Sequence, residues 1–174
     1  MRRSGSSAGE SEGVPLYKLG AVLSVALWVG LAVIGVADAR PTDTRSSVDA
    51  HSRAYVKQAR ACLTVAGLAI SIGKASNDDI QTAQAFRSAS ETCDAIRSRL
   101  VTMNTDHFSK QADLAWYGVD RIKSGLNAFI AYIDTRAPSK AAEAADKIGE
   151  GSTDVRAGVA GINARRQAYG LPRI

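Results

Sequence analysis

The chain has 174 residues, with 22 Lys and Arg against 17 Asp and Glu, and it contains 2 Cys and 2 His. Hydrophobic residues make up 45% of the sequence, which excludes a disordered polymer, and two cysteines are too few for a disulfide-dense miniprotein. Beyond the apolar segment near the N-terminus about 130 residues remain, enough for one core but not for two. The composition therefore predicts a single small domain.

The N-terminal region divides into a polar stretch and an apolar stretch. Residues 1–15 are rich in Gly, Ser and Glu and show no apolar periodicity, which predicts a disordered cytoplasmic tail. Residues 19–37 carry no charge, and a helix that spans a bilayer needs about 20 apolar residues. We therefore expect a transmembrane helix, a signal anchor over residues 16–38, that places the rest of the chain outside the cytoplasm.

Cleavage of this segment is the alternative. Ala37-Asp38-Ala39 has the small-x-small pattern of a signal peptidase site, and a cut after Ala39 would secrete a chain that begins at Arg40. Length favours the retained anchor, because the apolar region of a cleaved signal is usually about 7 to 15 residues long. Residues 39–45 are expected to form a linker, since Pro41 cannot continue a helix.

Helical periodicity dominates the remainder of the chain. Apolar residues recur at steps of three and four in four segments, which short connectors separate near residues 75–78, 104–107 and 136–139. Short connectors require neighbouring helices to be antiparallel. The predicted fold is all-α: an antiparallel up-down-up-down four-helix bundle over residues 46–168, followed by a C-terminal tail at 169–174.

Each segment carries one apolar stripe that we expect to face the core. The stripes comprise Val48, Ser52, Tyr55, Ala59, Cys62, Ala66 and Ala69 in the first segment, Ile80, Ala83, Phe86, Ala89, Cys93, Ile96, Leu100 and Met103 in the second, Phe108, Ala112, Ala115, Val119, Ile122, Leu126, Phe129 and Ile133 in the third, and Ala141, Ala145, Ile148, Ser152, Val155, Val159, Ile162 and Tyr169 in the fourth. Gly149 and Gly151 each weaken a helix by about 1 kcal/mol relative to Ala. The fourth helix is therefore expected either to continue through these glycines or to kink or restart there.

The two cysteines fit this arrangement. Cys62 and Cys93 lie at equal distances from a turn centred between Asn77 and Asp78, so an antiparallel hairpin places them at the same height on facing stripes. We expect a Cys62–Cys93 disulfide, which is typical of an oxidising extracytoplasmic compartment. The alternative is a pair of buried free thiols.

Metal and catalytic chemistry have little support. His51 and His107 fall at one end of the bundle near Asp49 and Asp106, and these histidines are the only candidates for a divalent metal site. The simpler interpretation is that His51 ends the core stripe, His107 lies in a loop, and nearby arginines oppose a cation. The Ser71-to-Lys74 segment matches S-x-x-K but lacks every partner motif of that chemistry. We expect no enzyme activity, no metal and no cofactor.

Basic residues gather at the end of the bundle that an anchor would hold near the membrane. Arg40, Arg45, Arg165 and Arg166 are the membrane-proximal basic residues, and they could face anionic lipid headgroups. A generally basic, soluble surface explains them equally well. Nucleic acid is not an expected partner, because the basic residues are interleaved with acidic ones and lack aromatic neighbours for stacking.

The first helix is apolar almost all round between Ala61 and Gly73. Val65, Leu68 and Ile72 project away from the Cys62 stripe, which predicts either deeper burial of this helix or an exposed surface for a protein partner or a second copy of the chain. We expect a membrane-anchored extracytoplasmic helical-bundle interaction module, an accessory or scaffold component of a cell-envelope membrane complex. The alternative function is a four-helix bundle that binds or senses a small apolar ligand.

Overall fold

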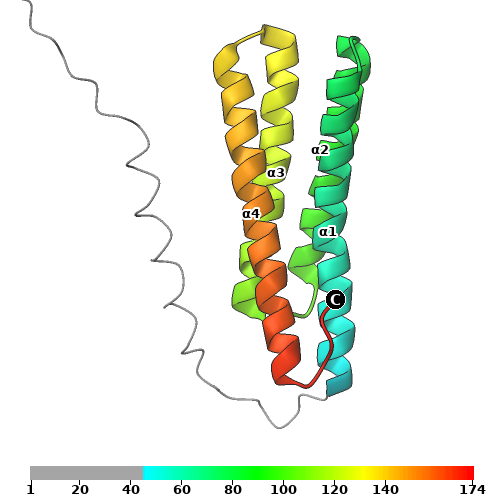
Figure 1. The fold of residues 1–174 in the computed structure, drawn as a ribbon, viewed down its shortest axis with the longest axis vertical. Helices are drawn as coiled ribbons and strands as arrows, with labels where there is room; N and C mark the ends of the chain where they lie inside the picture. Colours follow the sequence, from blue (N-terminus) through cyan, green and yellow to red (C-terminus); the bar gives the residue numbers. More distant parts are fainter. Residues whose placement is uncertain (1–44) are drawn as a thin grey trace, which may run out of the picture. The chain divides into compact units, whose positions relative to one another are not determined.

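The computed structural model describes residues 45–174, which form four α-helices and no strand. The helices are α1 (Arg45–Ala75), α2 (Asp79–Thr102), α3 (Ser109–Thr135) and α4 (Pro138–Ala168). Figure 1 shows them running alternately up and down, with the α1–α2 hairpin beside the α3–α4 hairpin. The predicted all-helical four-helix fold is confirmed. We call the two ends of the bundle the Arg45 end and the Ala75 end.

The predictions for the N-terminal region fall outside the described residues. They are the tail at 1–15, the anchor at 16–38, the linker up to residue 44, cleavage at Ala39 and the role of Arg40. Within residues 45–174, no helix is both long enough and apolar enough to cross a membrane. The structure therefore describes the part of the chain that follows the apolar segment.

Local sequence explains where the helices begin and end. The Asp78 carboxylate caps α2 by accepting a hydrogen bond from the backbone N–H of Ile80 at 2.7 Å, and Asp79 in the first turn complements the helix dipole. Pro138 begins α4, where its missing N–H costs nothing. Arg136 closes α3 in a left-handed conformation with φ 57°, and its N–H bonds the Tyr132 carbonyl.

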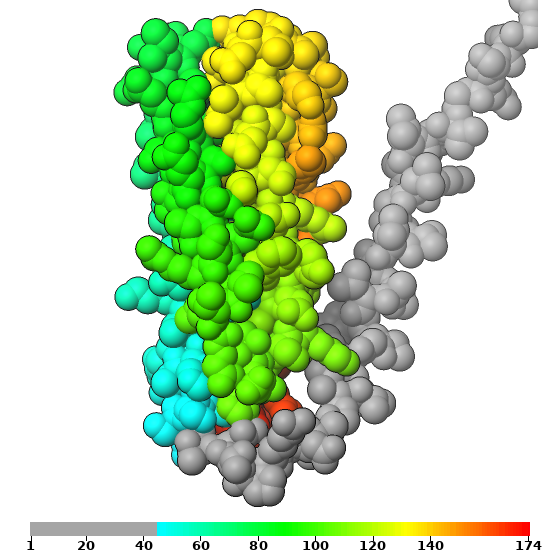
Figure 2. Space-filling model, turned by 180° about the vertical axis from the view of Figure 1, so that it is seen from behind, coloured from blue at the N-terminus to red at the C-terminus, as the bar shows by residue number. Residues whose placement is uncertain are grey.

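The core lies between the predicted stripes. Every stripe residue of α1 is buried, and so are the stripe residues of α2 from Ala83 to Leu100 and those of α3 from Phe108 to Leu126. The α1–α2 pairing is also as predicted, because Cys62 and Cys93 are at disulfide distance, with sulfur atoms 2.08 Å apart. Figure 2 shows the side chains of α2 and α3 meeting along the opposite face.

Two positions of the predicted stripes are wrong. The buried stripe of α2 is centred on Phe86, Cys93 and Leu100, seven residues apart, and Ile80 projects about 100° from that line, so it is 71% exposed. The N-terminal half of α4 buries Ala144 and Gly151, and the exposed Ala145 is turned away by the same angle. α4 nevertheless runs unbroken through Gly149 and Gly151.

The C-terminal tail packs against the bundle. Gly170 turns the chain with φ 68°, Leu171 is buried, and the end of the chain returns to lie beside α1 (Figure 1). The side chain of Asn163 holds Ile174 from both sides: its Oδ1 accepts from the Ile174 N–H at 2.8 Å, and its Nδ2 donates to the Ile174 oxygen at 3.0 Å. The tail thus joins α4 to α1 at the Arg45 end.

Candidate functional site

The predicted partner surface lies on the outer side of the α1–α2 hairpin. Leu68 is 60% exposed there, and Val65 and Ile72, at spacings of three and four residues, are half-buried beside it. Together with Ala85 and Ala89 of α2 they line a shallow groove of about 160 Å³. No charged side chain lines this groove, so it presents apolar and small polar groups to solvent. We call it the α1–α2 groove.

The apolar residues of α1 outside the Cys62 stripe lie partly against the core and partly on this surface. Leu63 and Ile70 on one side of the helix, and Val65 on the other, pack against the buried cluster. Leu68 projects away from the Cys62 stripe and remains exposed at the edge of the groove that α1 forms with α2. The two sequence interpretations, deeper burial and an exposed surface, therefore each describe part of the same helix.

A second apolar groove lies at the Ala75 end between α1 and α4, and sequence reasoning missed it. The groove measures about 390 Å³, and its large apolar lining residues are Ile70, Phe86, Phe129 and Ile148. The rings of Phe86 and Phe129 stack with centroids 4.2 Å apart. Both phenylalanines were assigned to the core by periodicity, but periodicity carries no signal for a gap between two hairpins. We call this the Ala75-end groove.

The two histidines do come together. Their rings stack with centroids 6.4 Å apart, and the ring of Tyr169 meets the edge of His107, also at 6.4 Å. The nearby carboxylate of Asp49 is engaged by Arg53 and Arg166 instead. Within residues 45–174, no group of three or more His, Cys, Asp or Glu residues is placed to hold a metal ion. His51, His107 and Tyr169 thus form a cluster of rings at the Arg45 end.

Arg166 is not a surface cation, which corrects its assignment to a membrane-facing basic group. Its side chain is fully buried and donates to the Asp49 carboxylate, to the Ser52 hydroxyl and, at 2.9 Å, to the Pro172 carbonyl. The hydrogen bond from Arg166 is the main cause of a pKa of Asp49 below its ordinary value. A buried guanidinium needs such partners, so Arg166 joins α1, α4 and the tail.

Two further basic residues of that group, Arg45 and Arg165, are also engaged. Arg45 donates to the Gly170 carbonyl at 2.6 Å. Arg165 donates to the His107 carbonyl at 3.0 Å, and its guanidinium lies over the Tyr169 ring at 5.4 Å. Both side chains hold loops and the tail in place at the Arg45 end, so their positive charges are only partly available to a partner.

Groups with shifted pKa values have structural explanations. Burial, with a smaller contribution from the charge of Asp113, raises the pKa of Tyr55, whose hydroxyl donates to the Ala112 carbonyl at 2.6 Å. Hydrogen bonds from Lys140 and Lys147 lower the pKa of Glu143 to about 2.

Comparisons of the chain with protein families, with curated protein sequences and with solved structures give no match. The surfaces and their chemistry are therefore the basis for any functional proposal.

Proposed function

We propose that the chain is a membrane-anchored, extracytoplasmic interaction module without catalytic activity of its own, an accessory or scaffold component of a cell-envelope membrane complex. The observation that carries the proposal is the exposed Leu68 in the lining of the α1–α2 groove. The partner that we propose is an amphipathic helix of another protein. It would lay its apolar face along the groove.

The shape and chemistry of the groove support a helical partner. Val65, Leu68 and Ile72 follow one another at the spacing of a helix face, and Ala85 and Ala89 provide a low opposite wall. Small side chains let a third helix approach two others closely. The hydroxyl groups of Ser88 and Thr92 at the rim offer polar contacts, and the groove contains no charge that an apolar surface would have to desolvate.

The proposed location depends on two features of the chain. The uncharged segment at residues 19–37 has the length of a membrane span. The Cys62–Cys93 pair is typical of proteins that fold in an oxidising compartment. A helical module held at the membrane surface by residues 16–38 would meet its partner at a high local concentration.

Site-specific crosslinking in intact membranes tests the proposal. A photoreactive amino acid at position 68 of the full-length chain should form an adduct with one partner segment, which peptide mass spectrometry would identify as an apolar helix face. The matched control is the same amino acid at Val101, an exposed apolar position of α2 outside the groove. Leu68→Glu should abolish the association and keep the helical circular dichroism, because Leu68 is exposed in the isolated chain.

Two results test the proposed surface: the adduct yield at position 68 relative to position 101, and the identity of the protein in the adduct. Equal yields at positions 68 and 101, or no adduct at 68, would overturn the proposed surface. An adduct between two copies of the chain would assign the groove to self-association instead of a partner protein. Light scattering of wild type and of Leu68→Glu would then show whether the oligomer depends on Leu68.

The Ala75-end groove favours a second candidate function, binding of a small apolar ligand. Its volume of about 390 Å³ lies within the usual range for ligand sites, about 300 to 1,000 Å³, and Lys74 is the one charged residue of its lining. A neutral dye such as N-phenyl-1-naphthylamine should fluoresce when bound there. Ala145→Phe should fill the groove and abolish the signal, whereas Ala142→Phe, on the exposed side of α4, should not. Equal signals in the two variants would exclude this function.

A further inference from the structure

We propose that a groove between α1, α4 and the C-terminal tail binds a linear polyanion whose backbone carries phosphate groups. The groove consists of two adjoining hollows of about 310 and 430 Å³ that share Arg60. It lies toward the Arg45 end of the bundle, on residues that belong neither to the α1–α2 groove nor to the Ala75-end groove. We call it the arginine groove.

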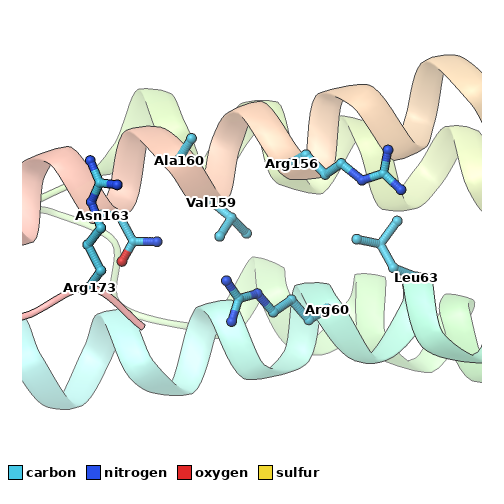
Figure 3. Close-up of a pocket in the computed structure, with 7 residues that line it drawn as sticks. All are labelled: Arg60, Leu63, Arg156, Val159, Ala160, Asn163 and Arg173. Atoms are coloured by element: carbon cyan, nitrogen blue, oxygen red, sulfur yellow. The ribbon is translucent and has the colours of Figure 1, made fainter.

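Three different elements supply its cations. Arg60 comes from α1, Arg156 from α4 and Arg173 from the tail, and all three line the first hollow. In Figure 3 the guanidinium groups follow one another along the two helices, with Arg173 at one end, Arg60 in the middle and Arg156 at the other end; Val159 lies beside Arg60, and Leu63 lies beside Arg156. Arg53 and Lys57 of α1 extend the basic lining into the second hollow. The charges therefore form a row and do not converge on one point.

Three of the five cations of this row have no anionic partner within residues 45–174. No Asp or Glu lines either hollow. Within the described part of the chain Lys57, Arg156 and Arg173 form no ion pair, whereas Arg53 is paired with Asp49, and Arg60 donates to the Ile174 oxygen at 2.9 Å. Several exposed cations in one concave groove repel one another and attract anions, so the groove favours a negatively charged ligand.

Shape selects among anionic partners. A flat membrane surface cannot follow a groove between two helices, and a single small anion would touch only one guanidinium of a row. An extended chain with repeated phosphates can contact each cation in turn, and arginine forks match phosphate oxygens. No aromatic side chain lines either hollow, so the stacking that single-stranded nucleic acids use is missing. The expected ligand is therefore a phosphate polymer without bases.

Calorimetric titration of the full-length chain with short-chain inorganic polyphosphate tests the inference. Binding should weaken with salt, because each phosphate contact contributes about −0.7 to the slope of log K against log salt concentration for a flexible chain. The double variant Arg156→Gln/Arg173→Gln should lower the affinity about tenfold and reduce the magnitude of that slope by about 1.4. Neither side chain makes a hydrogen bond or ion pair within residues 45–174, so the fold should be unaffected.

A matched variant separates the groove from net charge. Arg87→Gln/Arg99→Gln removes two exposed arginines of α2 and changes the net charge by the same amount, yet it should leave polyphosphate binding unchanged. Equal losses in the two double variants would overturn the inference. The inference would also be overturned if phosphatidylglycerol vesicles or single-stranded DNA bound more strongly than polyphosphate, with all three ligands compared at equal phosphate concentration. Circular dichroism of each variant would confirm that the helices are intact.

Discussion

Gly118 of α3 and Gly151 of α4 face each other across the interface between these helices, with no room for a side chain. A Cβ atom added to Gly118 would lie 2.6 Å from the Gly151 carbonyl oxygen, and one added to Gly151 would lie 2.6 Å from the Gly118 carbonyl oxygen. Gly125 and Gly158, each seven residues further along its own helix, meet the partner helix in the same way. The four glycines allow the α3 and α4 backbones to approach more closely than ordinary core residues would.

This close approach predicts opposite effects for two neighbouring glycines of α4. Gly151→Ala should destabilise the protein by about 1 to 3 kcal/mol, because the methyl group forces α3 and α4 apart. Gly149→Ala should be neutral or stabilising by up to about 1 kcal/mol, since its Cβ would have no neighbour within 4 Å and alanine is the better helix former. Urea unfolding of the two variants measures the difference. Equal effects would contradict the packing described for Gly151.

Two leucines of α3 test which face of this helix lies in the core. Leu126 is fully buried, and Leu114 on the same helix is 38% exposed. Leu126→Ala should cost about 2 to 5 kcal/mol of unfolding free energy, because it leaves a cavity in the core, whereas Leu114→Ala should cost well under half as much. Thermal unfolding of the full-length variants checks this. Similar losses for both would mean that the assigned face of α3 is wrong.

The contact between Asp49 and Arg166 predicts a dependence of stability on pH. The pKa of Asp49 is lowered in the folded protein from its ordinary value of 3.8, so the ionised carboxylate stabilises the fold above that pH. This contribution is lost as the pH falls below 3.8 and through the lower folded-state pKa. The gap in unfolding free energy between wild type and Asp49→Asn should therefore be largest at neutral pH and shrink at about pH 3.

An exposed aspartate provides the control for this experiment. Asp146 forms no ion pair within residues 45–174, so Asp146→Asn should track wild type at every pH. Urea titrations across the acid range give all three curves. A constant gap between wild type and Asp49→Asn would show that Asp49 contributes nothing through its charge.

The disulfide predicts a loss of stability without a loss of helix. Cys62 and Cys93 are 31 residues apart, and opening a loop of that size removes about 3 to 4 kcal/mol in the chain-entropy description. Cys62→Ala/Cys93→Ala should therefore lower the melting temperature, while its far-UV circular dichroism at low temperature matches wild type. Non-reducing mass analysis of the wild-type chain should show no free thiol. Two free thiols in protein from its native compartment would contradict both the bond and the proposed location.

Periodicity in the sequence was sufficient for the helices, most of the core and the cysteine pairing. Each of these depends on one local regularity, the 3.6-residue turn, and on the symmetry of a short antiparallel connection. Leu126 and Cys93 could therefore be assigned to the core without knowing how the hairpins meet. Ile80 and Ala145 were misplaced, because a shift of one residue along a helix turns a side chain by about 100° and so moves it out of a narrow stripe.

Only the tertiary structure decided the features that depend on how the two hairpins and the tail meet. The burial of Arg166 requires Asp49, Ser52 and Pro172 to converge from three segments, and the arginine groove requires cations from three elements to lie in one row. The Ala75-end groove exists because α1 and α4 do not close over Phe86 and Phe129 there. Asp49 and Arg166, for example, are 117 positions apart, and no local repeat encodes the distance between two helices that are not connected in sequence.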